Sequence, residues 1–411
     1  MATLVDSPPP LPSPLVPLAS PFPTSIAPLS QLLFGLSLTT GSHAFTTLSI
    51  GAGIYWLFDL AIDRRSGGYT DVYIAGCTIF SAVFRMIAVN YLEDGGVERR
   101  GRVRKGGEEE EEEKKKKKEV YEVGEKMEET AKGWVQTGLD AVELGFMNPR
   151  GVGWNFQLRN LPPTPARDTP RLPFAAKHLV SAAIDLLLVD LSYYHLRHNS
   201  PIASLPIRPL TSQPLPLALF NAWLIYLQAR WTMNALHSIL AAITVPMHIF
   251  SPAGFPPLFG SFKHAYTIKG FWSHTWHQMM RTLALPYTNA LVRTLHLNPS
   301  QKSTYWVKVS SAFFWAWAVH AYGTLIAGGG YTADLYRYVP QVAAFWVEEK
   351  VMELGRRLGL KGRGWRIAGY VWVFCFQGAT LIVWFGPAVR MGAHLKGPLP
   401  WSFVEWVVAK I

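Results

Sequence analysis

The stretch VSSAFFWAWAVHAYGTLIAGGGYTA, residues 309–333, contains no Asp, Glu, Lys or Arg. Comparable uncharged runs cover residues 7–58, 209–229, 231–262 and 367–389. A helix that crosses a bilayer needs roughly 20 mostly apolar residues, whereas a surface helix of a soluble domain carries a charged face. Because a backbone inside a membrane must satisfy its own hydrogen bonds, such runs predict helices. The sequence therefore predicts an all-α integral membrane protein.

The predicted architecture is a polytopic bundle of about seven to nine transmembrane helices. The 16 tryptophans among 411 residues are typical of aromatic belts at membrane interfaces. Residues 209–250 could form two short helices or one long bent helix. The expected spans are 44–62, 72–92, 176–196, 211–229, 231–250, 306–327 and 367–389, with further candidates at 26–41 and 338–354.

Composition divides the chain into five parts. Residues 1–25 are a Pro-rich lead-in, and residues 26–92 hold the N-terminal transmembrane helices. Residues 93–147 include the tract RRGRVRKGGEEEEEEKKKKKE, which cannot bury a core. We expect a solvated, low-complexity cytosolic insert here, with an interaction tail as the alternative. Residues 148–395 form the main helical core, and residues 396–411 form a C-terminal tail.

The charge distribution limits the possible chemistry. The net charge of +11 suits an anionic partner such as phospholipid, nucleic acid or a phosphorylated cofactor. The cations lie mainly in short loops between spans, which the positive-inside rule explains, so we expect no nucleic-acid partner. Residues 191–333 hold nine Lys and Arg but no Asp or Glu. This excludes paired-carboxylate catalysis and a hard metal site there, and favours a neutral base beside an anionic cofactor.

Cys77 and Cys375, the two cysteines, lie inside apolar runs. They form no spacing motif, so the sequence predicts neither a metal cluster nor a disulfide framework.

The segment GFWSHTWHQMMR, residues 270–281, combines two Trp, two His and one Arg. If it is helical, Trp272 and Trp276 share one face, while His277 and Arg281 share another. One interpretation is an amphipathic helix at the membrane interface, with the indoles among the headgroups. The other is a functional site that presents imidazole and guanidinium together.

His320 lies inside the uncharged run 309–333. An ionisable side chain at that depth is a functional candidate, and burial favours its neutral, basic form. A structural histidine that is hydrogen-bonded to a neighbouring helix is the alternative.

Several blocks occur in an order that resembles one enzyme family. They are NPRGVGWNFQLRNLP at 148–162, FWSHTWHQMMR at 271–281, the intramembrane His320, AAFWVEEKV at 343–351 and IAGYVWVFCFQGATLIVWFGP at 367–387. The chain resembles the wax synthase-like branch of the membrane-bound O-acyltransferases, especially fungal members that acetylate secondary metabolites. The resemblance runs from about residue 45 to residue 395, apart from the charged insert. It departs from the family where WAWAV, rather than a Ser-Gly pair, precedes His320.

The resemblance implies an acyl-CoA:alcohol O-acyltransferase with acetyl-CoA as co-substrate, no tightly bound cofactor and no metal. It implies that His320 is the general base and that His277 is its partner, placed to stabilise the oxyanion. Arg281, Lys263 and Lys269 are candidates to hold the CoA phosphates. Trp272 and Trp276 could stack on adenine, line the acyl entrance or anchor the interface.

The family also suggests the acceptor and the compartment. We expect a lipophilic alcohol, most simply a hydroxylated terpenoid or related fungal metabolite that partitions into the bilayer, and a location in the endoplasmic reticulum. A long-chain wax ester or acylglycerol synthase is the enzymatic alternative, and a transporter or non-catalytic membrane scaffold is the alternative of another class. Arg150 and Trp154 are further candidates, although a solvated Gly-rich turn would explain them as well.

Overall fold

The computed structural model describes residues 32–37, 40, 43–62, 69–92, 134–143, 148–154, 157–158, 160–198, 200–203, 207–395, 397, 399 and 401–410. The regular elements in these ranges are all helices. The expected lead-in 1–25, part of the candidate span 26–41 and most of the charged insert 93–147 lie outside them. The long helices are α2 (His43–Ile62), α3 (Tyr69–Ile87), α6 (Arg171–His198), α7 (Leu215–Thr244), α9 (Met279–Thr294), α10 (Lys302–Ile326), α11 (Thr332–Arg357) and α12 (Arg363–Arg390).

Shorter helices connect and extend these elements. They are η1 (Ala88–Leu92), α5 (Trp134–Val142), η4 (Pro201–Ala203), η5 (Leu210–Ser212), η6 (Pro252–Gly254), η7 (Phe262–His264), α8 (Ile268–Gly270), η8 (Phe271–Thr275) and α13 (Phe403–Val408).

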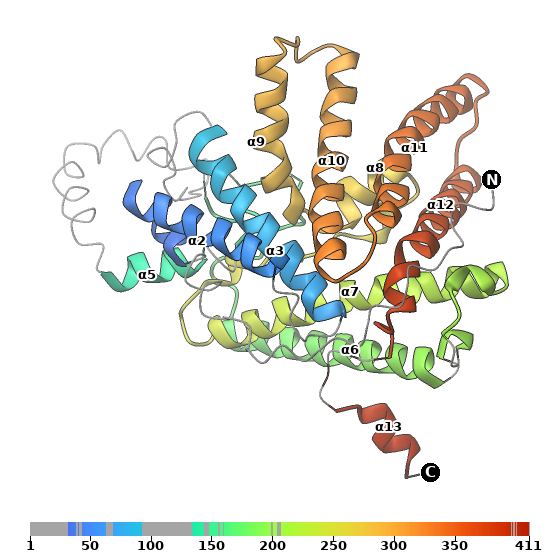
Figure 1. Ribbon diagram of the computed structural model, residues 1–411, viewed down its shortest axis with the longest axis horizontal. Coiled ribbons are helices and arrows are strands. Elements are labelled where there is room, and N and C mark those ends of the chain that lie inside the picture. The colour runs from blue at the N-terminus through green and yellow to red at the C-terminus, as the bar shows by residue number, and fades with distance from the viewer. Residues whose placement is uncertain are drawn as a thin grey trace.

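Helix α10 is at the centre of the helix packing, because it contacts α3, α9 and α11. Helices α6 and α7 pack along one another and run across the bottom of Figure 1, below the upright pair α9 and α10. Helix α12 contacts both α7 and α11, so it ties the crossing pair to the upright helices. Residues far apart in the sequence therefore meet around the lower half of α10.

Six predicted spans coincide with helices: 44–62 with α2, 72–92 with α3 and η1, 176–196 with α6, 306–327 with α10, 338–354 with α11 and 367–389 with α12.

Within residues 209–250, for which two arrangements remained possible, Leu215–Thr244 form one long helix, α7, rather than two. Within this helix, the guanidinium of Arg230 lies over the rings of Phe259 and Phe262, with its Cζ 4.6 and 4.8 Å from their centroids.

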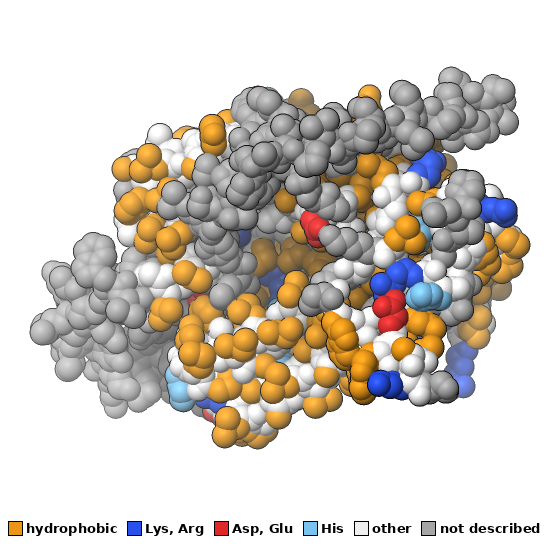
Figure 2. Space-filling model, turned by 60° about the horizontal axis from the view of Figure 1, so that its bottom comes forward, with side chains coloured by type: hydrophobic (Ala, Val, Ile, Leu, Met, Phe, Trp, Pro, Cys, Tyr) orange, Lys and Arg blue, Asp and Glu red, His pale blue; other side chains and the backbone are white. Residues whose placement is uncertain are grey.

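Among the described residues, three helices are long and apolar enough to cross a membrane: α3, α6 and α12, with mean hydropathies of 1.3, 1.6 and 1.6. The apolar side chains of α6 remain largely exposed, for example Leu172 at 74% and Val180 at 60%. Figure 2 shows hydrophobic side chains spread over much of the face formed by the bottom of Figure 1. These surfaces suit a hydrocarbon environment. A count of seven to nine transmembrane helices stays a prediction.

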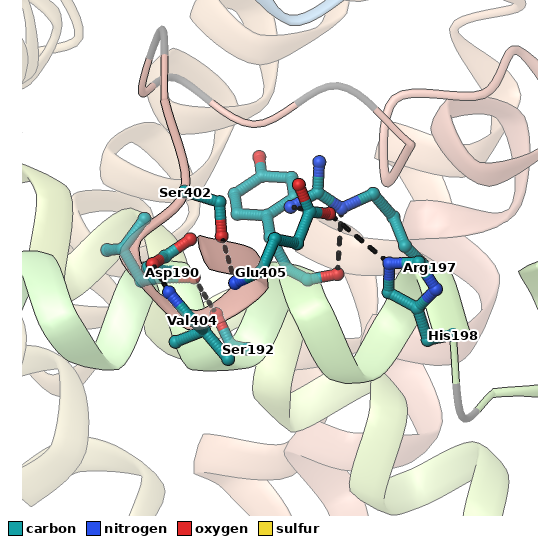
Figure 3. A network of polar contacts seen from close by, with 9 residues as sticks. Asp190, Ser192, Arg197, His198, Ser402, Val404 and Glu405 are labelled. Atoms are coloured by element: carbon teal, nitrogen blue, oxygen red, sulfur yellow. Dashed lines mark hydrogen bonds and ion pairs between the residues drawn. The ribbon is translucent and has the colours of Figure 1, made fainter. Parts of the chain in front are cut away.

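The C-terminal helix α13 packs against α6 (Figure 3). The Asp190 carboxylate accepts a hydrogen bond from the Val404 backbone N–H at 2.9 Å. Glu405 pairs with Arg197 and His198, each at 3.2 Å. A cavity of about 410 Å³ lies beside these contacts. Part of the expected tail 396–411 is thus a docked helix.

Candidate active site

His320 lies in α10 within a cage of aromatic rings from three other helices. Its imidazole stacks on Tyr73 of α3, with centroids 6.0 Å apart, and on Tyr338 of α11, at 5.2 Å. The Trp384 ring of α12 meets it edge-on at 5.3 Å. Helix packing therefore fixes the plane of the imidazole, and each of the neighbouring helices α3, α11 and α12 contributes one ring.

The two nitrogens of His320 have different environments. Nδ1 is hydrogen-bonded to the Tyr73 hydroxyl, and the Cys77 sulfur lies 3.9 Å from the same nitrogen. The hydrogen bonds of His320 within the described part of the chain involve Nδ1 alone and leave Nε2 without one. One nitrogen is thus held by the protein while the other is free for a substrate. This division is what a positioned general base requires.

His277 lies between η8 and α9 rather than inside a continuous helix. The segment 268–275 begins as α8, widens into the π-helix η8 and then breaks, because Trp276 has extended backbone angles. Helix α9 starts anew at Met279. The helical arrangement considered for residues 270–281 is therefore wrong, and His277 and Arg281 do not share a helix face.

Local hydrogen bonds stabilise the break. The side-chain amide of Gln278 donates to the carbonyls of Trp272 and Trp276, at 2.9 and 2.8 Å. The Gly260 N–H donates to the Thr275 carbonyl at 3.0 Å. A side chain at Gly260 would collide with the His274 carbonyl oxygen, which lies 1.8 Å from the Cβ position. These contacts replace the helical bonds that the break removes.

His277 approaches His320 closely enough for the two imidazoles to interact electrostatically. Its Nδ1 is buried and has no hydrogen-bond partner among the described residues. Burial, with a smaller contribution from the Arg150 charge, lowers the pKa of His277 to about 4. The imidazole is therefore neutral at pH 7. One of its two nitrogens carries a hydrogen, which it can donate to a ligand.

Arg150 and Trp154 do not lie in a solvated turn, because both side chains are buried. The Arg150 guanidinium donates to the carbonyls of Pro256 and Pro257, each at 2.8 Å. Burial lowers the pKa of Arg150 to about 10, so the group stays charged at pH 7. This residue clamps the loop that precedes η7 and contributes positive potential near His277.

The three cations predicted to bind phosphate lie in the segment 263–281, in two environments. Lys263 in η7 and Lys269 in α8 are exposed. Arg281 is half-buried and donates to the Gln278 side chain at 3.2 Å. His274 interacts electrostatically with Arg281, Lys269 and His264, so these groups form a local cationic cluster.

Trp272 and Trp276 belong to the protein core. Trp276 is buried and stacks on Tyr226, with centroids 4.1 Å apart. The Trp272 indole donates to the Gln341 side chain at 2.9 Å, and its ring faces the Arg337 guanidinium at 5.2 Å. Neither indole is an isolated interfacial side chain.

Sequence reasoning missed Tyr73, Tyr338, Trp384 and Arg337. The first three are aromatic residues in aromatic-rich segments, so nothing in the pattern distinguishes those that surround His320. Arg337 could have been found, because it is a charged residue immediately before the candidate span 338–354.

No group of three or more His, Cys, Asp and Glu that could hold a metal occurs in the part of the chain that the structure describes.

Comparison with known proteins gives a consistent result. Residues 255–347, which include His277, His320 and Arg337, match the model of the membrane bound O-acyl transferase family. The chain is 30% identical over 250 residues to the acetyltransferase ple2 of Rhodocybe pseudopiperita, covering 58% of this chain and 64% of ple2. It is 27% identical over 291 residues to the acetyltransferase nanB of Aspergillus nanangensis, covering 63% of this chain and 69% of nanB.

A third relative has a different name. The O-Mevalon transferase macI of Penicillium terrestre is 35% identical over 149 residues, which cover 35% of this chain and 34% of macI. No solved structure matches the chain. These matches relate the chain to the membrane-bound O-acyltransferases. The similar proteins include fungal proteins named acetyltransferases.

Proposed function

We propose that the chain is an acyl-CoA:alcohol O-acyltransferase of the endoplasmic reticulum membrane, with acetyl-CoA as its acyl donor. The observation that carries the proposal is the state of His320. Its Nδ1 is held by Tyr73, its ring is caged by aromatic residues, and its Nε2 is free. The similarity to fungal acetyltransferases supports the same reaction.

In the proposed reaction His320 Nε2 accepts the proton of the substrate hydroxyl. The alcohol oxygen attacks the thioester carbonyl carbon, so a C–O bond forms and the carbonyl oxygen becomes an oxyanion. The oxyanion then collapses, the C–S bond breaks, and CoA leaves as a thiolate. The proton on His320 passes to the thiolate, which restores the neutral imidazole. No acyl-enzyme intermediate is needed.

His277 is proposed to donate a hydrogen bond to the oxyanion. It is neutral, close to His320 and has a nitrogen without a protein partner. A preorganised donor in a site without water is effective because charge develops there only in the transition state.

The exposed Lys263 and Lys269, with Arg281, are proposed to hold the phosphates of CoA, since phosphate needs cations that remain accessible from water. The core positions of Trp272 and Trp276 fit the wall of an acyl entrance better than stacking on adenine.

The acceptor is proposed to be a hydroxylated terpenoid or a related metabolite. Such an alcohol is mostly apolar with one polar handle, so it concentrates in the bilayer and can reach His320 from the lipid side.

An acyl group larger than acetyl is the second candidate. The observation that favours it is the 35% identity to a relative whose name describes transfer of a mevalon group. A long-chain ester synthase would be the extreme case of this alternative.

The test is ester formation by microsomes that contain the protein, supplied with acetyl-CoA or palmitoyl-CoA and a panel of terpenoid alcohols. We expect acetyl esters, and we expect His320→Ala to reduce their formation by at least about 100-fold at equal membrane abundance. His198→Ala is the matched control, because that side chain lies at the exposed end of α6. Long-chain esters without acetyl esters would favour the second candidate. Unchanged turnover in His320→Ala would refute the base and favour a transporter or scaffold.

A further inference from the structure

Arg337 is a charged residue in the centre of the helix bundle. It lies in α11, its side chain is 0% exposed, and it is the largest fully buried side chain of the described residues. Its Nη1 donates to the Gln377 side chain and, at 2.6 Å, to the Thr380 hydroxyl. Both partners belong to α12, so the guanidinium is held in one orientation between the two helices.

One edge of this guanidinium has no partner. Nε and Nη2 are buried and form no hydrogen bond among the described residues. Together these two nitrogens form one of the two-donor edges of arginine, whose parallel N–H groups match the two oxygens of a carboxylate. The acid nearest in sequence, Asp334, instead accepts a hydrogen bond from the Trp384 indole at 2.7 Å. No ion pair of Arg337 occurs within the described ranges.

An unpaired guanidinium in a helix core is costly, because arginine stays protonated and cannot become neutral to avoid desolvation. The rings of Trp272, Tyr226 and Trp384 lie 5.2 to 5.6 Å from its Cζ and offset part of that cost. Of these residues, only Tyr226 brings a possible acceptor, its hydroxyl, near the guanidinium. The buried Tyr226 hydroxyl also lacks a hydrogen bond of good geometry. A bound anion would satisfy both groups.

The unpaired edge of the Arg337 guanidinium lies near His320. Arg337 and His320 both contact the ring of Trp384, and they interact electrostatically. The next residue, Tyr338, stacks on the imidazole. An anion at Arg337 would therefore be part of a molecule whose reacting group lies at His320. The phosphates of CoA fit less well, because the exposed lysines of α8 and η7 offer them a site in contact with water.

We propose that Arg337 binds a carboxylate carried by one of the two substrates, either the acceptor alcohol or the acyl group. The inference rests on the proposed acyl transfer at His320. It specifies a substrate class: a lipophilic hydroxy acid, or an acyl-CoA whose acyl chain ends in a carboxylate. The two-donor edge binds both carboxylate oxygens, and the bound carboxylate neutralises the guanidinium.

The test compares matched substrates that differ in one carboxylate. Oleanolic acid and its methyl ester, and ricinoleic acid and its methyl ester, are the acceptor pairs with acetyl-CoA. Malonyl-CoA and acetyl-CoA, with farnesol as acceptor, are the donor pair. We expect one arm to show kcat/KM higher for the carboxylate member by about tenfold or more. Arg337→Met should bring that ratio close to one, Arg337→Lys should leave it intermediate, and Arg356→Met, at the exposed end of the same helix, should leave it unchanged.

Thermal stability provides a second measurement if Arg337→Met does not fold. In lipid nanodiscs, the carboxylate member of the preferred pair should raise the unfolding temperature of the wild-type protein, whereas the matched member without the carboxylate should not. The inference is overturned if the wild-type protein favours neither carboxylate in either arm, or if Arg337→Met slows acid and ester equally. If wild-type protein acylates no acceptor at all, the proposed function itself has failed.

Discussion

Tyr73 of α3 and His320 of α10 are separated by 247 positions in the sequence, and they join through a hydrogen bond between the phenol hydroxyl and imidazole Nδ1. For Nε2 to accept a proton, the hydrogen of the neutral ring must reside on Nδ1 and be donated to the Tyr73 oxygen. Tyr73 thus selects the tautomer and the orientation of the proposed base. It is a positioning residue, because it acts on the reaction through His320.

Tyr73→Phe should therefore lower kcat and leave KM for the alcohol nearly unchanged. The loss of one hydrogen bond predicts a decrease of roughly two- to tenfold. Steady-state kinetics of ester formation would measure it. Tyr55→Phe is the control, because that side chain is exposed on α2. A kcat equal to that of the wild-type protein would show that the aromatic cage alone orients the imidazole.

His277→Ala should reduce kcat by about 100- to 1000-fold, the typical effect of removing an oxyanion donor. His277→Gln retains an N–H donor and should recover part of the activity. Burst and steady-state measurements with acetyl-CoA would separate this loss from weaker binding. If Ala and Gln variants are equally active, the side chain does not donate to the oxyanion.

Acid should destabilise the protein partly through His277. Its pKa is about 4 in the folded protein and near 6.5 in an unfolded chain, so the unfolded state binds more protons between these values. The stability that depends on the neutral imidazole is complete above about pH 6.5 and is lost as the pH falls toward 4. The loss is at most about 3 kcal/mol. Thermal unfolding in nanodiscs should show a shallower acid decline for His277→Gln, and parallel declines would contradict the burial of this group.

Charge reversal of the exposed lysines should weaken acyl-CoA binding. Lys263→Glu and Lys269→Glu should each raise KM for acetyl-CoA roughly threefold to tenfold, with less effect on kcat, because each removes a cation that would hold phosphate. The effect should diminish at high salt. Lys410→Glu, an exposed residue just after α13, is the control. A KM that is unaffected by both reversals would place the phosphates elsewhere.

The sequence predicted the helical class, because long uncharged runs leave a strong local pattern. The roles of His277 and His320 came from the family resemblance and stay predictions. The sequence did not predict the path of residues 270–281. That path depends on Gln278 and on the close approach of Gly260, which are tertiary contacts. The roles of Tyr73 and Trp384 were equally inaccessible, since only the packing of α3, α10 and α12 distinguishes them from many similar aromatics. A solvated Gly-rich turn was the alternative explanation of Arg150, because such turns usually lie at the surface. In the structure its guanidinium is buried and donates to two proline carbonyls.

Glu348 of α11 should be needed to hold the segment that carries His277. Its carboxylate accepts the backbone N–H groups of Ile268 at 2.7 Å and Lys269 at 3.2 Å, at the start of α8. Glu348→Ala leaves these donors without their partner, so we expect a loss of about 1–3 kcal/mol in stability and a lower kcat. The adjacent Glu349→Ala removes only a surface pair with Lys302 and should change stability by less than about 1 kcal/mol. Thermal unfolding and ester formation, measured on both variants in nanodiscs, would check this. Equal effects of the two substitutions would mean that the carboxylate of Glu348 does not anchor α8.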